Sequence, residues 1–523
     1  MDTKALRQKI LDLAIRGKLV PQDPDDEPAS VLLERIRQQK QQMVKEGKLK
    51  PKDIKNDSVI FAGEDNLHYE KFSDGSVKCI EDEIPFDLPE GWAWVRLGNL
   101  SAAIQYGLSN SAEPQGTHRL LRITDIQDGK VDWNAVPFTT VNDPEAYLLK
   151  TGDIVFARTG ATVGKSFLIT ETPYPSVYAS YLIRIRLLGS LSPEYIYQFF
   201  DSACYWSQIT DKSVGVGQPN CNGTSLKELF IPLPPISEQL RIVPTAQALL
   251  AYVAKIDAEK KSLLSIIMAT KSKILDLAIR GQLIPQDPND EPASVLLERI
   301  RAEKEELIKQ GKIKRDKKES VIFRGEDNSY YEKMPDGKLH CLDDQLPFEL
   351  PDGWEWCNLS MIGTTNIGLT YRPTNIEPDG VIVLRSCNIV NDQVDLSDLV
   401  RVKTTIRENQ YVQKNDILIC ARNGSRALVG KCALIPDLGE PASFGAFMAI
   451  YRTEYFEYIV HYLRSSFFRS VFDDSNSTAI NQLTQDMLKR AIVPLPPVFE
   501  QRRITETIDA MLFELNQMEK SLI

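Results

Sequence analysis

Apolar residues recur every three or four positions along the end of the chain. A heptad seam on a helix is predicted by steps of four and three residues through Ile504, Ile508, Met511, Leu515, Met518 and Leu522. The same register occurs upstream at Ile242, Ala246, Leu249, Val253, Ile256 and Leu263. Because the pattern continues to an Arg280-Gly281 stop, we expect one helix from about Ser237 to Arg280, roughly 65 Å long. Pro244 falls in its early turns, where proline is tolerated.

Two further patterns fill the rest of the chain. The charged segment 292–311 and its earlier twin predict a second type of helix. Short apolar runs such as DIVFA, SYLIRIRL, VIVLRS and DILICA are strand-like, and Gly, Pro, Asn and Asp separate them. We therefore expect compact α/β modules between the helical segments.

Much of the chain is written twice. Three pairs of segments match: 10–37 with 274–301, 58–97 with 320–359, and 226–242 with 488–504. The copy at Ile274 follows the long predicted helix, whereas the copy at Ile10 has no such helix before it. The last segment, 500–523, supplies that missing helix. The pattern predicts a two-fold repeat in circular arrangement, opened within one helical unit.

Between the matching segments the two halves differ in sequence, but two shorter stretches in each half remain similar. Residues 120–132 echo 383–395, and residues 152–169 echo 415–435. A shared framework with different surface side chains is typical of two modules that recognise different things.

Composition and cysteine spacing narrow the class of protein. The 523 residues are 42% hydrophobic and 26% charged, and no run is apolar enough to span a bilayer. The first residues lack the apolar core of a signal peptide, so we expect a cytoplasmic location and no membrane partner. The eight cysteines never form a CxxC pair, which favours buried reduced thiols over a zinc site.

The net charge of −10 is unevenly distributed. Residues 95–235 carry eleven basic against twelve acidic side chains, and residues 357–497 carry fourteen of each. The acidity therefore belongs to the segments between two near-neutral modules. If the chain binds nucleic acid, locally placed basic residues in the modules must do so.

The sequence offers no convincing catalytic centre. Segments 160–166 and 424–432 resemble a phosphate-binding loop, but three and five residues separate their glycines where that loop has four. An adenine methyltransferase motif is missing. Glu259 and Lys261 have a nuclease-like spacing but fall on the predicted long helix, which favours a solvated charge pair. A glycine-rich turn presenting basic residues to a nucleic-acid backbone fits both copies better.

Polar, aromatic and basic residues gather in the loops of each module. Segments 104–110 and 366–372 occupy comparable places and contain side chains able to distinguish base edges. Ordinary turn chemistry is the alternative. The tryptophans of LPEGWAW and LPDGWEW, at 92, 94, 354 and 356, sit where each module begins, so core anchoring is favoured over base stacking.

Together these motifs resemble the specificity subunit of type I restriction-modification systems. The carriers are the paired IPLPPISEQ and VPLPPVFEQ junctions, the paired LPEGW and LPDGW segments, the GDIVFARTG…VGK skeleton and the permuted repeat. The resemblance implies an α+β fold, with two α/β target recognition domains joined by long antiparallel coiled-coil helices. It implies five segments: helical regions 1–91, 236–353 and 498–523, and recognition domains 92–235 and 354–497.

The resemblance also implies a noncatalytic subunit that binds a bipartite, asymmetric double-stranded DNA target. Two modification subunits carrying S-adenosylmethionine would dock on it to methylate adenines, and restriction (motor) subunits would join the full complex; no cofactor is expected in this chain. DNA contact is expected at Gln105, Tyr106, Ser109, Arg122, Thr124, Arg158, Thr159, Lys165, Thr370, Tyr371, Arg372, Arg385, Asn388, Arg422, Asn423 and Lys431. Two alternatives stay open: a coiled-coil scaffold whose modules bind protein, and an enzyme with an unrecognised active site.

Overall fold

The computed structural model describes residues 2–522 apart from 128, 213–219, 314, 316–319 and 474–481. It forms two compact units, Met1–Lys260 and Lys261–Ile523. The boundary falls inside the 44-residue helix α7 (Ile236–Ile279), which includes Pro244. The sequence prediction of one helix from about 237 to 280 is confirmed. None of the helices in the described part of the chain is long and apolar enough to cross a membrane.

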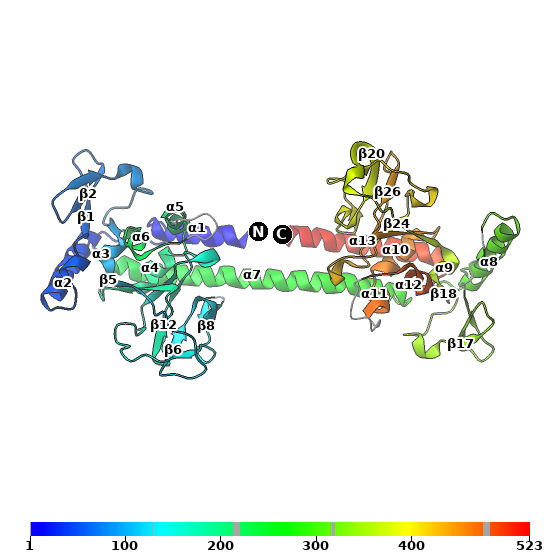
Figure 1. Cartoon of the computed structure of the whole chain (residues 1–523), viewed down its shortest axis with the longest axis horizontal. Coiled ribbons are helices and arrows are strands. Elements are labelled where there is room, and N and C mark those ends of the chain that lie inside the picture. Colours follow the sequence, from blue (N-terminus) through cyan, green and yellow to red (C-terminus); the bar gives the residue numbers. More distant parts are fainter. Residues whose placement is uncertain are drawn as a thin grey trace. The chain divides into compact units, whose positions relative to one another are not determined.

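In each unit a second helix runs antiparallel to its share of α7 (Figure 1). In unit 1 this is α1 (Thr3–Ile15), where the Thr3 hydroxyl donates to Asp257 at 3.0 Å and Ile10 packs against Ala246 and Val253. In unit 2 it is α13 (Val498–Leu522), where Lys271 pairs with Glu519 at 2.5 Å. The expected antiparallel helix pairs are confirmed.

The buried stripe of these helices departs from the predicted heptad seam. Ile504 and Ile508 are fully buried and Leu515 packs on the core, as predicted, but Met511 and Met518 are exposed, and Leu512, which is outside the predicted seam, packs on the core. Leu249 and Leu263 of α7 are likewise exposed. A straight helix has 3.6 residues per turn, so its buried stripe drifts away from a strict seven-residue repeat unless the helices supercoil.

Each unit also carries a charged helix followed by a small antiparallel sheet. In unit 1 these are α2 (Ala29–Lys45) and β1 (Ser58–Ala62), β2 (His68–Phe72) and β3 (Val77–Cys79). In unit 2 they are α8 (Ala293–Lys309) and β15 (Val321–Arg324), β16 (Tyr330–Lys333) and β17 (Leu339–Cys341).

The first module is built on two sheets. One has the order β11-β10-β13-β5, formed by Ser166–Leu168, Ile154–Ala157, Leu182–Leu187 and Ser101–Tyr106, and all its pairs are antiparallel. The other has the order β12-β6-β9, formed by Ser176–Tyr178, His118–Leu121 and Phe138–Thr139. Three helices, α4 (Pro193–Phe199), α5 (Ala203–Lys212) and α6 (Gly223–Lys227), complete the module with the hairpin β7–β8 (Ile126–Gln127 and Lys130–Val131).

The second module repeats this plan with one change. Its larger sheet has the order β19-β27-β24-β25-β22-β21, formed by Thr364–Ile367, Met448–Arg452, Ile417–Cys420, Cys432–Leu434, Gln393–Val394 and Ile389–Val390. Its smaller sheet, β23-β20-β26, is formed by Val400–Val402, Ile376–Leu384 and Ala442–Phe444. The hairpin β21–β22 joins the larger sheet here, whereas β7–β8 stands apart. Helices α10 (Phe456–Arg464), α11 (Ser466–Asp473) and α12 (Gln485–Arg490) follow.

Short strand pairs close each module where it begins and ends. In the first, β4 (Ala93–Arg96), followed by α3 (Leu97–Leu100), pairs with β14 (Phe230–Leu233). In the second, β18 (Glu355–Asn358), followed by α9 (Leu359–Ile362), pairs with β28 (Ile492–Leu495). The strand predictions for DIVFA, SYLIRIRL, VIVLRS and DILICA are confirmed by β10, β13, β20 and β24.

The tryptophans at the module boundaries are core residues. Trp92, Trp94, Trp354 and Trp356 are all buried. The indole N–H of Trp92 donates to Glu238 and that of Trp354 to Glu500, so each module is tied to the first turn of its helix. The expectation for the cysteines is only partly right, because Cys79, Cys341 and Cys387 are exposed; all eight are free thiols.

Candidate nucleic-acid interface

The glycine-rich segment of each module is a hairpin turn. In the first module it joins β10 to β11, which pair antiparallel, and Gly160 and Gly164 have φ of +71° and +88°. In the second it joins the antiparallel strands β24 and β25. A phosphate-binding loop of an ATPase leads from a strand into a helix instead. The turn therefore places Arg158 and Arg422 at equivalent points, directly after or near the end of a buried strand.

In each module the loop that follows β5 or β19 contains a glycine, Gly107 or Gly368, at which two backbone segments come close together. A Cβ on Gly107 would stand 2.3 Å from the carbonyl oxygens of Tyr178 and Ala179, and one on Gly368 would stand 2.1 Å from that of Gly445. The next residues, Leu108 and Leu369, form parallel bridges with Ala179 and Gly445. Each glycine thus allows the loop that follows β5 or β19 to cross the end of the smaller sheet.

An exposed aromatic side chain stands beside each arginine. Tyr181 and Phe447 are each 61% exposed, the same fraction in both modules. The carbonyl of Tyr181 accepts from the backbone N–H of Arg158 at 3.1 Å, and that of Phe447 accepts from the N–H of Arg422 at 3.0 Å. The two modules therefore present one basic and one aromatic residue in the same local arrangement. Sequence reasoning missed both aromatics.

Little in the sequence indicated that these two aromatic side chains are exposed. Tyr181 and Phe447 each directly precede a largely buried strand, β13 and β27, whose first two residues are apolar and mostly or fully buried. A large aromatic that opens such a strand reads as one more core residue. Only the three-dimensional structure shows that these side chains lie outside the core. There the backbone carbonyl of each aromatic residue is bonded to the arginine while its ring is exposed.

Arg158 is a cation without a carboxylate partner among the residues that the structure describes. Its guanidinium lies 5.0 Å from the centroid of the Tyr106 ring, and its Nε is buried without a hydrogen-bond partner. The Tyr106 hydroxyl accepts from the N–H of Gly223 at 2.9 Å, which fixes the ring. Lys165 is exposed beside the same turn. Cation–π contact holds the arginine in place and leaves its charge unneutralised.

Two other predicted contacts are ion-paired within the protein. Arg122 makes a bidentate pair with Asp125, with the shorter contact at 2.6 Å, and this hydrogen bond raises the pKa of the guanidinium. Arg385 pairs with Asp398 at 2.9 Å. Both side chains are partly exposed, but a neighbouring carboxylate offsets their charge. They are weaker candidates for phosphate contact than Arg158 and Arg422.

The remaining predicted DNA-contact residues of the first module differ in whether they are exposed or engaged by other residues of the protein. The Gln105 side-chain oxygen accepts from the buried Arg184 at 2.8 Å, and desolvation lowers the pKa of that guanidinium. Thr159 is held by an antiparallel bridge to Asn220. Ser109 and Thr124 are exposed. Gln105 thus supports the strand pair, while the exposed hydroxyls are free to meet a ligand.

In the second module the loop residues vary in the same way. Thr370 and Arg372 are exposed, whereas Tyr371 packs against the cluster of Leu369, Val383 and Val402. Arg422 is exposed and its guanidinium lies 5.5 Å from the Phe447 ring centroid. Asn423 accepts from the N–H of Ser425 at 3.0 Å, and the Lys431 ammonium donates to the carbonyl of Ile389.

Asn388 does not fit the expectation of a DNA contact. It is 1% exposed, and its amide donates to the carbonyls of Asp395 and Asp398 at 3.0 and 2.8 Å while its oxygen accepts from the N–H of Arg385. A side chain with all these groups satisfied closes the turn that it belongs to. In this conformation it is unavailable to a ligand.

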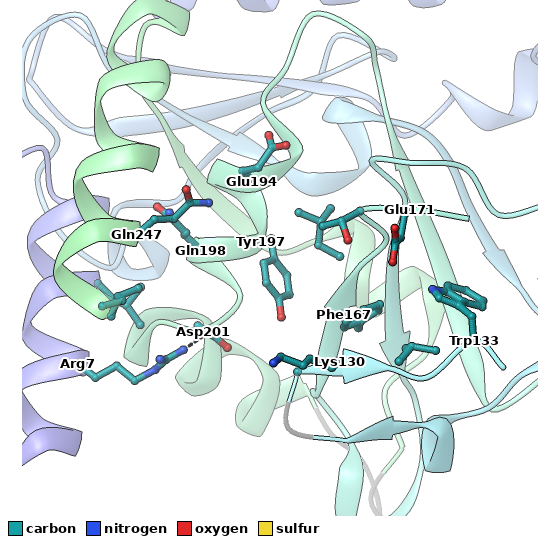
Figure 2. A pocket seen from close by; sticks show the side chains of 16 residues that line it. Arg7, Lys130, Trp133, Phe167, Glu171, Glu194, Tyr197, Gln198, Asp201 and Gln247 are labelled. Carbon is teal, nitrogen blue, oxygen red and sulfur yellow. Dashed lines mark hydrogen bonds and ion pairs between the residues drawn. The ribbon is translucent and has the colours of Figure 1, made fainter. Parts of the chain in front are cut away.

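A separate hollow lies between the first module and its helices (Figure 2). It has a volume of about 470 Å³ and is lined by residues of β8, α4, α1 and α7. Arg7 and Asp201 face each other there in an ion pair of 2.7 Å. In unit 2 the position equivalent to Asp201 is occupied by Arg464, which donates to the carbonyl of Asp392 in the hairpin β21–β22. The hairpin β7–β8 thus lines a hollow in the first module, whereas in the second the hairpin β21–β22 is hydrogen-bonded to the end of α10.

Comparisons with known proteins were made for the whole chain. A family model described as the type I restriction modification DNA specificity domain matches residues 89–266 and 351–523. The specificity subunits of type I restriction enzymes EcoAI and EcoEI, both from Escherichia coli, are 28% and 27% identical to this chain, and each match covers 99% of this chain and 90% of the relative. The chain is also similar in fold to a solved structure.

That structure is described as the structural basis underlying complex assembly and conformational transition of the type I R-M system. The match covers 84% of this chain and 94% of that one, with a TM-score of 0.51 and 18% identity. At this identity the likeness concerns the fold alone.

Proposed function

This chain belongs to the type I restriction-modification DNA specificity family, and on that premise we propose that each of its modules reads one half of a split DNA target. As a specificity subunit it recognises DNA and leaves catalysis to other subunits. The observation that carries the proposal is a repeated pair, Arg158 with Tyr181 and Arg422 with Phe447, in which the aromatic is exposed and the arginine has no carboxylate partner in the described part of the chain.

The chemistry of these pairs suits a duplex. An arginine that lacks a carboxylate partner attracts phosphate or donates to guanine in the major groove, and an exposed ring offers apolar contact to a base edge. The flanking residues differ between the modules, with Ser109 and Ser111 in one where Thr370 and Arg372 stand in the other. Equal frameworks with unequal side chains would read two different half-sites, which makes the target asymmetric.

The helical segments would hold the partners and set the gap between the half-sites. We assign residues 92–235 and 354–497 to recognition and residues 1–91, 236–353 and 498–523 to this frame. Two modification subunits, each supplying S-adenosylmethionine for adenine methylation, would bind two equivalent surfaces, as a repeated frame permits. Restriction subunits would join the same assembly.

Footprinting of the chain together with its modification subunit tests this proposal. We expect protection of one split, asymmetric sequence, and adenine methylation in both halves when the genome of a host expressing the pair is sequenced. Equal retention of every DNA sequence by the complete assembly would contradict it. Modules that bind protein instead of DNA would leave no sequence protected.

A further inference from the structure

Each repeat exposes an apolar face on its small three-stranded sheet. In unit 1 the outer sheet face consists of Val59, Phe61, Tyr69, Lys71, Val77 and Cys79, because these residues alternate with inward ones and lie opposite one another in the strand register. In unit 2 it consists of Val321, Phe323, Tyr331, Lys333, Leu339 and Cys341. Val77 and Leu339 are 53% and 55% exposed, and the other apolar members are exposed or half-buried.

The inner face of each sheet packs against the hydrophobic core, and the outer face does not take part in this packing. Ile60 packs on the cluster of Ile80, Trp94 and Phe230. Ile322 packs in the same way on Leu342 and Trp356. A sheet covered on one side would ordinarily carry polar residues on its other side. An apolar outer face therefore indicates a surface that another molecule covers.

The two outer sheet faces are also alike in geometry. The rings of Phe61 and Tyr69 stack with centroids 6.0 Å apart, and those of Phe323 and Tyr331 do so at the same distance. The Tyr69 hydroxyl donates to Asp65 at 2.8 Å, and the Tyr331 hydroxyl donates to Asp327 at 2.7 Å. The flat aromatic pair is thus held in one orientation in both units.

Several exposed positions outside the faces have changed between the repeats, although the turn residues 64–66 are identical to 326–328. Ala62 corresponds to Arg324, Leu67 to Ser329, and Ser76 to Lys338. On the faces, five of the six positions are identical and the sixth exchanges Val77 for Leu339. The two faces are thus more alike than the rest of these sheets. The constancy points to the same partner at both sites.

Charge and symmetry decide which class of partner fits. Residues 58–83 carry seven acidic and two basic side chains, and residues 320–345 carry six and three, so these acidic sheets repel phosphate. A second copy of this chain is also a poor fit. Two self-associating faces per chain would link chains into an open array instead of a closed complex.

We propose that each outer sheet face docks one copy of a protein subunit that the assembly holds twice, through an apolar surface edged by Lys and Arg. The inference rests on the proposed function, in which that subunit is the modification subunit. The six face residues pack against its apolar surface, and the acidic turns around Asp65 and Asp327 meet its basic edge.

The test is the number of modification subunits per chain, measured by native mass spectrometry on complexes of the full chain. We expect two for the wild type. Val59→Lys with Val77→Lys should leave one, Val321→Lys with Leu339→Lys should also leave one, and the fourfold variant should leave none. Lysine places a charge on the apolar contact and repels the basic edge.

Two further sets of variants separate docking from folding. The fourfold threonine variant at the same positions keeps the β-branched shape at residues 59, 77 and 321, and should weaken docking less than the lysine variant while keeping the far-ultraviolet dichroism of the wild type. The matched control is Val31→Lys with Val295→Lys, an equivalent pair of exposed valines on α2 and α8. It should retain two subunits.

The outcomes separate the two proposals. A wild-type chain that recruits no modification subunit would contradict the proposed function. A wild-type chain with two, together with a fourfold lysine variant that also keeps two, would overturn only the docking inference. Equal loss in the Val31 and Val295 control would likewise overturn it, because the effect would not belong to the sheets.

Discussion

The indole N–H of Trp92 donates to a carboxylate oxygen of Glu238 at 2.8 Å, and both side chains are buried. The same bond joins Trp354 to Glu500 at 3.0 Å. The tryptophan opens a recognition module and the glutamate lies in the first turn of the helix that leaves it. This explains why LPEGW occurs with PPISEQ in one repeat and LPDGW with PPVFEQ in the other: each pair of motifs forms the two halves of one buried contact.

We expect Glu238→Ala to destabilise unit 1 by about 1–3 kcal/mol, because the buried indole N–H would lose its acceptor. Glu238→Gln keeps an oxygen at the same place and should cost much less. Urea unfolding followed by tryptophan fluorescence measures both. An equal loss in the two variants would show that the charge, and not the hydrogen bond, matters.

The same carboxyl predicts a pH dependence. Burial raises the pKa of Glu238 above its ordinary value of 4.5, although the bond from Trp92 lowers it, and Glu500 is affected in the same way. The folded state therefore holds these protons more tightly than the unfolded state. Their contribution to stability is complete below the unfolded pKa and is lost as the pH rises through the raised folded pKa.

Relative to the double variant Glu238→Gln, Glu500→Gln, the wild type should therefore lose free energy of unfolding as the pH rises from about 4.5 towards neutrality. Urea midpoints measured at several pH values in this window check the sign. A wild type that gains stability relative to the variant over the same window would contradict the assignment.

Arg158→Ala should lower DNA affinity for all sequences and reduce the salt dependence of binding by about one ion, as expected for a phosphate contact. Arg122→Ala is the matched control, since Asp125 already offsets its charge and its effect should be smaller. Binding of the complete assembly at several salt concentrations measures both slopes. An effect of Arg158→Ala confined to one base pair would assign it to base reading instead.

The exposed aromatics should act on one half-site each. Tyr181→Ala should slow methylation of one half of the target by about tenfold, in keeping with the loss of a base-edge contact worth roughly 1–3 kcal/mol. Phe447→Ala should affect only the other half. Tyr181→Phe, which keeps the ring, is the control. Separate methylation rates for the two halves are the measurement, and a loss in both halves from one variant would refute the assignment.

Most of the fold could be predicted from the sequence, whereas the roles of the individual residues at the candidate nucleic-acid interface could not. Period and repetition located the long helix, the permuted repeat and the core tryptophans, because these features follow from local geometry and burial. The role of a loop residue depends on its neighbours in space. Arg122 and Arg158 look alike in sequence, yet among the residues that the structure describes only Arg122 has a carboxylate beside it. Asn388 resembles a base-reading amide but closes its own turn.

Exchange of one recognition module for that of a related protein tests whether each module determines its half of the target independently of the helical frame. Residues 92–235 begin at the Trp92 contact and end just before the helix that carries Glu238, so a donor module with both motifs should restore the same buried bond. We expect the exchange to change one half of the methylated sequence and to keep the other half, since the second module closes through its own pair, Trp354 and Glu500. Methylome sequencing of hosts expressing the parent and the exchanged chain is the measurement. A change in both halves would mean that the modules read DNA jointly, because the buried Trp–Glu contact that closes each module lies within its own unit.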